Sequence, residues 1–202
     1  MKFNVILFED FETLDVFGPV EVIGKLDKFY DIEFYSEKGG LIKSGQNLKV
    51  ETFPFTDIKE TGIIFIPGGM GTRKEIYNQQ FIDKIKALCI NAQFVLTVCT
   101  GSALLARTGL IKGLKAASNK LAFDMVAGLD SDVQWIKKSR WTVDGKYYTS
   151  SGVSAGIDMT LGFVSDRLGL ETAEKIANGI EYIWNRDKEN DHFFKNVVGG
   201  EK

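Results

Sequence analysis

The sequence has few of the side chains that build disulfide frameworks or zinc sites. Its 202 residues include two cysteines, Cys89 and Cys99, and one histidine, His192. One cysteine pair cannot form a framework of several disulfides, and these three side chains cannot supply the four thiolate or imidazole ligands of a structural zinc site. Composition leaves a metal site made only of carboxylates open, but no motif proposes one.

Long apolar runs and an excess of basic residues are also missing. The longest apolar runs, such as residues 62–66, have strand length, and Met1-Lys2 leads directly into an expected strand rather than a signal peptide. The 25 Lys and Arg residues are matched by 27 Asp and Glu residues, which leaves no basic surplus for a phosphate backbone. We therefore expect a cytoplasmic protein that binds neither membranes nor nucleic acid.

No linker rich in Pro, Gly or Ser divides the chain. Hydrophobic residues make up 44% of it and charged residues 26%, as in ordinary globular proteins. We expect one domain over residues 1–202, with a core at about 3–184 and a polar tail at 185–202. His192 falls in this tail and is expected on the surface.

Apolar segments of strand length alternate with segments of helical periodicity along the chain. This alternation predicts a doubly wound α/β sandwich with a mostly parallel central sheet, in which functional residues gather at the carboxyl ends of the strands. The expected strands are residues 3–8, 31–36, 63–66, 94–98, 135–136, 141–143 and 147–149, with a hairpin at 41–52. The expected helices are residues 14–23, 80–92, 118–128, 153–168 and 171–184.

Cys99 lies where the strand 94–98 gives way to the helix formers of residues 103–106. A sharp strand-to-helix turn pushes the side chain away from the backbone and places it near the free N–H groups of a helix, which favour a thiolate. The alternative is a small core residue, because free cysteines are often buried. Cys89 falls on the apolar face of the helix 80–92 and is expected in the core.

An acid follows the first expected strand, in the apolar stretch 14–19. Asp15 either caps a helix there or brings its carboxyl group to the sulfur of Cys99, where it can relay protons during covalent catalysis. Glu12, one helical turn earlier, is the alternative acid.

Small residues with exposed backbone groups follow the other strands. Gly68 and Gly69, after Pro67, either form a tight turn or let the backbone approach a ligand and aim N–H groups at a developing negative charge. Thr100 supplies a hydroxyl and an N–H beside the sulfur, or serves only as a helix cap.

Four motifs in this order resemble the ThiJ/PfpI superfamily. They are LDVFGP at residues 14–19, PGG at 67–69, VCTGS at 98–102 and SGVSAGID at 151–158, and together they span the chain from the first strand to the last helices. The acid in a Leu-Asp-x-x-Gly-Pro context and the cysteine in a Cys-Thr-Gly-Ser turn are most similar to the isocyanide hydratase branch. The resemblance implies a flavodoxin-like fold, related to the class I glutamine amidotransferases.

The resemblance also implies roles for residues of this chain. Cys99 would be the nucleophile at a nucleophile elbow, Asp15 the acid or base that hydrogen-bonds to it, and Thr100 a second contact in the pocket. Backbone amides of the glycine turn and of the residue after the cysteine would steady the intermediate. Gly152 and Val153 would line the pocket at the start of a helix.

The implied reaction takes place on a small molecule. The thiolate attacks the terminal carbon of an isocyanide, proton transfer gives a thioimidate, and water addition releases an N-substituted formamide. The resemblance implies a homodimer and neither a cofactor nor a metal.

The chain departs from many relatives at residues 113–120. Where they carry His-Trp it has Asn119-Lys120, and an asparagine cannot act as a general base. This change removes a Cys-His dyad and alters the pocket wall. The alternatives to a hydratase are therefore a redox or electrophile stress sensor that oxidises at Cys99, and a protein related to intracellular proteases and amidases that lacks the usual histidine. A ligand-binding module of a DNA-binding regulator is not expected, since no helix-turn-helix follows the last helix.

Overall fold

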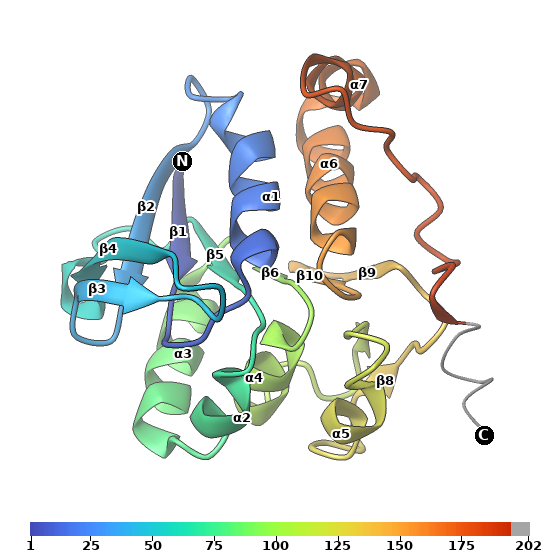
Figure 1. The fold of residues 1–202 in the computed structure, drawn as a ribbon. Helices are drawn as coiled ribbons and strands as arrows, with labels where there is room; N and C mark the ends of the chain where they lie inside the picture. Colours follow the sequence, from blue (N-terminus) through green and yellow to red (C-terminus); the bar gives the residue numbers. More distant parts are fainter. Residues whose placement is uncertain (195–202) are drawn as a thin grey trace.

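The computed structural model describes residues 1–194, in which one central sheet lies between two groups of helices (Figure 1). The sheet has eight strands, in the spatial order β3 (Gly40–Lys43), β4 (Lys49–Pro54), β2 (Asp31–Ser36), β1 (Lys2–Ile6), β5 (Ile63–Ile66), β6 (Phe94–Thr97), β10 (Tyr147–Ser150) and β9 (Trp141–Asp144). A small second sheet pairs β7 (Lys115–Ala116) with β8 (Gln134–Trp135). The doubly wound α/β fold predicted from the sequence is confirmed.

The six inner strands run parallel, and the edge strands β3 and β9 are antiparallel to their neighbours. From β1 the chain moves outward to β2, and it later returns to place β5 on the other side of β1. The strand order therefore reverses between β1 and β5, where folds of this type form a crevice at the carboxyl ends of the strands. The loops after β1 and β5 meet at this crevice.

The helices divide into two groups. Figure 1 shows α1, α6 and α7 on one side of the sheet and α2 to α5 on the other. Packing of α1 on α6, of α6 on α7 and of α3 on α4 agrees with this division. The helices are α1 (Thr13–Gly24), α2 (Thr72–Glu75), α3 (Gln79–Asn91), α4 (Gly101–Arg107), α5 (Phe123–Ala127), α6 (Ala155–Leu168) and α7 (Leu170–Gly179), with a single 3₁₀ turn at Phe55–Asp57.

Burial from both faces explains the continuous apolar runs of the central strands. Every residue of β5 is buried, as expected for a parallel strand covered by helices on both sides. On α3, one face buries Phe81, Ile82, Ile85 and Cys89. Cys89 is fully buried, so its predicted place in the core is confirmed.

The helix predicted over residues 118–128 is largely absent. Only α5, at Phe123–Ala127, is helical. The Ser118 hydroxyl donates to the Cys99 carbonyl at 3.1 Å, and the Asn119 side chain accepts the N–H of Ala122 at 3.1 Å. Such side-chain bonds to the backbone compete with helix formation, and residues 118–122 form an irregular segment before α5.

The last helix is also shorter than predicted. It ends at Gly179 rather than near residue 184. Glu181 has a φ of 51°, which an α-helix does not tolerate. The Tyr182 hydroxyl and the Trp184 indole N–H instead reach Asp158 on α6, at 3.1 Å each. These contacts lead the following segment away from α7.

The helices formed by residues 1–194 include none that is long and apolar enough to span a bilayer.

Candidate active site around Cys99

Cys99 occupies a strained turn between β6 and α4. Its φ is 59°, in the left-handed region that residues with a side chain rarely adopt, at a cost of about 1–3 kcal/mol. The Cys99 N–H donates to the Ser151 carbonyl at 3.1 Å, and its carbonyl accepts from the Ser102 and Ser118 hydroxyls at 3.0 and 3.1 Å. Three hydrogen bonds therefore hold the backbone in the sharp turn that the sequence predicts.

Asp15, in the first turn of α1, is completely buried beside Cys99. Its Oδ2 accepts the N–H of Gly68 at 2.9 Å, whereas its Oδ1 has no hydrogen-bond partner among residues 1–194. Burial raises the pKa of this carboxyl from 3.8 to about 7, against the lowering effects of the Gly68 N–H and of a contact with the Cys99 thiol. That contact is not a fully aligned hydrogen bond, as is common at catalytic groups without substrate.

Gly68 is required for this arrangement. A Cβ at this position would lie 2.6 Å from the Thr100 nitrogen and 2.8 Å from the Asp15 Oδ2, closer than nonbonded atoms approach. The glycine therefore lets the loop after β5 fit between the acid and the turn at Cys99. The backbone at Gly68 thus closely approaches Asp15 and Thr100, and the predicted approach to a ligand stays a prediction.

The N–H groups of Gly68 and Gly69 were expected to face a reaction intermediate, but both donate to side chains of the protein. The Gly68 N–H is taken by Asp15, and the Gly69 N–H donates to the Thr100 Oγ1 at 3.1 Å. The N–H groups that bond the Cys99 sulfur, and so lower its pKa, are those of Thr100 and Val153. The amides placed to stabilise negative charge at the sulfur thus come from the turn itself and from the residues before α6.

Thr100 ties the turn to the loop after β5. Its hydroxyl lies 3.0 Å from the hydroxyl of Thr72, which in turn lies 2.7 Å from the Gly69 carbonyl. Thr72 is completely buried and was not recognised from the sequence. Thr72 follows Gly69-Met70-Gly71, a pattern that resembles an incomplete phosphate loop and does not by itself predict a contact near the cysteine.

Asn119 stands beside the sulfur where many relatives have histidine. Because its Oδ1 accepts the Ala122 N–H, its amide group is left to donate to Cys99, which lowers the pKa of the thiol. Gly152 makes room for it, since a Cβ there would lie 2.3 Å from the Asn119 Nδ2. Asn119 can therefore steady charge at the sulfur, although it cannot take up a proton.

Val153 completes the surroundings of the thiol. Its φ of 45° is unusual for a β-branched residue, and it turns the Val153 N–H toward the sulfur. Two strained residues, Cys99 and Val153, thus face each other from neighbouring strand ends.

The thiol itself is poorly ionised. Burial raises the pKa of Cys99 from 9.0 to about 12, and the negative charge of Asp15 adds to this effect, while three donors lower it. The helix N-terminus, which by sequence favours a thiolate, is outweighed here by loss of solvent. A protonated thiol needs a base, and the neighbouring Asp15 carboxyl, with a pKa of about 7, is placed to serve as one.

Glu12, the alternative acid, points elsewhere. Its two carboxylate oxygens accept from the Gln46 side chain at 3.0 and 3.1 Å, on the partly exposed side of the loop after β1. Its charge acts on the site only by raising the pKa of Asp15. His192 is exposed in the tail segment, as predicted.

A pocket of about 400 Å³, called here the entry pocket, shares Asn119 and Val153 with the surroundings of the thiol. Its lining includes Asn119, Leu121, Gly152, Val153, Ser154 and Phe193. Gly152 and Val153 line this pocket, and their predicted place in a pocket that holds the reacting thiol stays a prediction. Leu121 and Phe193 were not recognised from the sequence.

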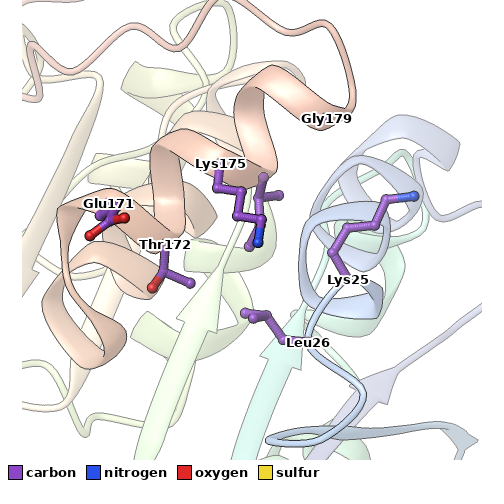
Figure 2. A pocket seen from close by; sticks show the side chains of 7 residues that line it. Lys25, Leu26, Glu171, Thr172, Lys175 and Gly179 are labelled. Atoms are coloured by element: carbon purple, nitrogen blue, oxygen red, sulfur yellow. The ribbon is translucent and has the colours of Figure 1, made fainter.

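A larger hollow lies between the C-terminal end of α1 and α7. Figure 2 shows this hollow, of about 610 Å³, between the end of α1 with Lys25 and Leu26 and the helix α7 with Thr172 and Lys175. It contains neither cysteine of the chain. Among residues 1–194 no cluster of three or more His, Cys, Asp or Glu side chains is arranged to hold a metal ion.

Comparisons with known proteins identify the family of the chain. The model of the DJ-1/PfpI family matches residues 1–166. An isonitrile hydratase from Pseudomonas putida is 29% identical over 186 residues, which cover 90% of this chain and 78% of the relative. The deglycase PfpI from Pyrococcus furiosus is 25% identical over 154 residues, which cover 74% of this chain and 89% of the relative. The crystal structure of a ThiJ/PfpI family protein from Pseudomonas syringae has a TM-score of 0.80 at 26% identity, covering 90% of this chain and 74% of that one. Since the family model spans most of the sequence, the chain belongs to the DJ-1/PfpI family.

Proposed function

We propose that the protein is a cofactor-free, cysteine-dependent hydratase of small electrophilic molecules, and that it converts isocyanides to N-substituted formamides. The observation that carries this proposal is the completely buried Asp15 carboxyl beside a thiol held in a strained turn. Its pKa of about 7 lets it take up and return a proton near neutral pH.

The reaction balances with these groups and one water molecule. Asp15 accepts the proton of the Cys99 thiol, and the sulfur forms a bond to the terminal carbon of the isocyanide. The proton passes from Asp15 to this carbon, which gives a thioimidate. Water then adds to the same carbon, the C–S bond breaks, and the thiol regains its proton as the formamide leaves.

The amides around the sulfur suit the charged stages of this sequence. The Thr100 and Val153 N–H groups and the Asn119 side chain favour negative charge at the sulfur just before attack and just after the C–S bond breaks. The likeness to an isonitrile hydratase supports the same chemistry, and the likeness to a deglycase supports an enzymatic role. The proposal includes a cytoplasmic location, expected from the sequence, and a homodimer, carried over from the resemblance.

The direct test is the incubation of purified protein with cyclohexyl isocyanide. We expect loss of the isocyanide and formation of an equal amount of N-cyclohexylformamide, measured by NMR. The absence of formamide with alkyl and aryl isocyanides alike would contradict the proposal.

A redox sensor is the second candidate, since the same amides and the neutral Asp15 carboxyl can hydrogen-bond to the oxygens of a cysteine sulfinic acid. Intact-mass measurement after mild peroxide treatment distinguishes it. A sensor gains two oxygen atoms at Cys99 before other residues react, and a uniform pattern of oxidation would exclude this role. An amidase or protease would need another base in place of a histidine, and no observation favours either of these two functions.

A further inference from the structure

The outer part of the entry pocket is apolar and comes from parts of the chain far apart in sequence. Leu121 lies in the loop before α5, Val153 lies before α6, and Phe193 lies in the segment that follows α7. Leu121 is 91% exposed and Phe193 is 57% exposed. Large apolar side chains that converge on a hollow while facing solvent are typical of a ligand site.

The segment carrying Phe193 is fixed in place over the body of the protein. Figure 1 shows it running from the end of α7 down past β9. Its Lys188 carbonyl accepts the N–H of Arg140 at 2.8 Å, and its Asp191 N–H donates to the Lys138 carbonyl at 2.8 Å. The wall formed by Phe193 is therefore part of the folded structure.

One buried acid sets the position of this wall. The tail was predicted to be polar and solvated, but Asp191 is only 5% exposed. Its Oδ1 lies 3.5 Å from the Arg140 Nη1 and accepts the N–H of Phe193 at 3.0 Å, while its Oδ2 lies 3.8 Å from the Lys120 Nζ. The same carboxylate thus neutralises two buried cations and orients the backbone at Phe193.

The cation nearest the pocket is not free to bind a ligand. The Lys120 Nζ donates to the Ser139 carbonyl at 2.5 Å and faces Asp191, and Lys120 is only 4% exposed. The Arg140 guanidinium is likewise bound to Asp158, at 2.6 Å, and to Asp191. The pocket therefore offers a ligand apolar surface and no unpaired charge.

We propose that the entry pocket binds an uncharged apolar group of the substrate, such as a cycloalkyl or aryl substituent, and that Phe193 determines how well a bulky group is held. This inference rests on the proposed function only in placing the reacting carbon at Cys99. A volume of about 400 Å³ is within the range of small-molecule sites, roughly 300–1,000 Å³. The substrate class is thus a neutral electrophile whose reactive group carries a bulky hydrocarbon substituent.

The test measures binding without chemistry. N-cyclohexylformamide and N-methylformamide are titrated into the wild-type protein, into Phe193→Ser and into the control Phe29→Ser, with binding followed by ligand-observed NMR. Phe29 is a matched control because it is 53% exposed and lies after α1, away from the entry pocket. We expect the Kd for N-cyclohexylformamide to rise about tenfold in Phe193→Ser and to stay unchanged in Phe29→Ser, since losing apolar contact in a pocket costs about this factor.

The outcomes separate this inference from the proposed function. Equal affinity of the wild-type protein and Phe193→Ser for N-cyclohexylformamide overturns the inference, as does the absence of binding to the wild-type protein or equal affinity for the two formamides. Binding that depends on Phe193 supports the inference even where no isocyanide is converted, a result that rejects only the proposed reaction.

Discussion

The two cysteines of this protein have the same burial and the same shift in acidity but different surroundings. Cys89 is completely buried and Cys99 is 6% exposed, and burial raises the pKa of each thiol to about 12. Cys89 lies within α3 among apolar side chains, whereas Cys99 lies in a left-handed turn against a buried carboxyl. Burial and acidity thus do not distinguish the two thiols; backbone strain and a neighbouring acid with a pKa of about 7 do.

Removal of each sulfur in turn gives the largest expected difference. We expect Cys99→Ala to lower the rate of formamide formation at least about 1,000-fold, because the covalent step is lost. Cys89→Ala should keep the wild-type rate and lower the free energy of unfolding by about 1 kcal/mol, from the small cavity it leaves. Rates by NMR and unfolding in urea give both quantities, and substantial activity in folded Cys99→Ala would show that the two cysteines do not differ in function.

Removal of the acid should make Cys99 resemble Cys89 in reactivity. We expect Asp15→Asn to lower kcat/KM about 100-fold or more, because an amide cannot accept the thiol proton. In the wild-type protein the base form of Asp15 exists only above its pKa of about 7, so kcat/KM should fall as the pH drops below 7. This inflection should be absent from Asp15→Asn.

Glu12→Gln is the matched control for the acid. Glu12 pairs with Gln46 rather than with the thiol, so kcat/KM at pH 8 should change less than about threefold. A larger loss in Glu12→Gln than in Asp15→Asn would assign the role of base to the other acid.

A smaller effect on stability should accompany the loss of activity. The pKa of Asp15 rises from 3.8 in the unfolded chain to about 7 in the fold, so the folded state binds the extra proton between these values. Wild-type stability from this group is therefore greatest below about pH 4 and declines as the pH rises to 7. Relative to the wild-type protein, Asp15→Asn should gain on the order of 1–4 kcal/mol between pH 4 and 8.

The stability difference of Cys89→Ala should not change over this interval, because its thiol does not titrate below pH 8. Urea unfolding at several pH values measures both variants. A pH-independent difference for Asp15→Asn would mean that the buried carboxyl is not destabilised by charge.

The sequence predicts the position of the turn at Cys99 better than it predicts the pKa of the thiol. A run of strand formers followed by Cys-Thr-Gly-Ser and helix formers is a local pattern, and so is an acid within an apolar stretch. By contrast, the pKa of Cys99 depends on how completely two layers of helices remove water, which no local segment reveals. The acceptors of the Gly68 and Gly69 N–H groups could not be predicted either, since Asp15 and Thr100 come from distant parts of the chain.

The pocket wall was beyond prediction for a similar reason. Asp191 and Phe193 lie in a charge-rich tail, where local composition indicates solvent exposure. Their positions follow from pairing with Lys120 and Arg140, which are 71 and 51 residues away in sequence. Asn119 was predicted as part of the pocket wall in place of a histidine. Its position as a donor beside the sulfur became visible only from the hydrogen bond that its Oδ1 accepts from Ala122.

The order of strands in the sheet determines when during folding the Cys99 thiol meets the Asp15 carboxyl. Asp15, Gly68 and Cys99 follow the neighbouring strands β1, β5 and β6, and the Gly68–Asp15 bond alone spans 53 residues. Such distant segments meet late, after the loops between them have closed. Cys99 can meet the Asp15 carboxyl only once the central sheet is assembled, so the surroundings of this thiol report completion of the fold.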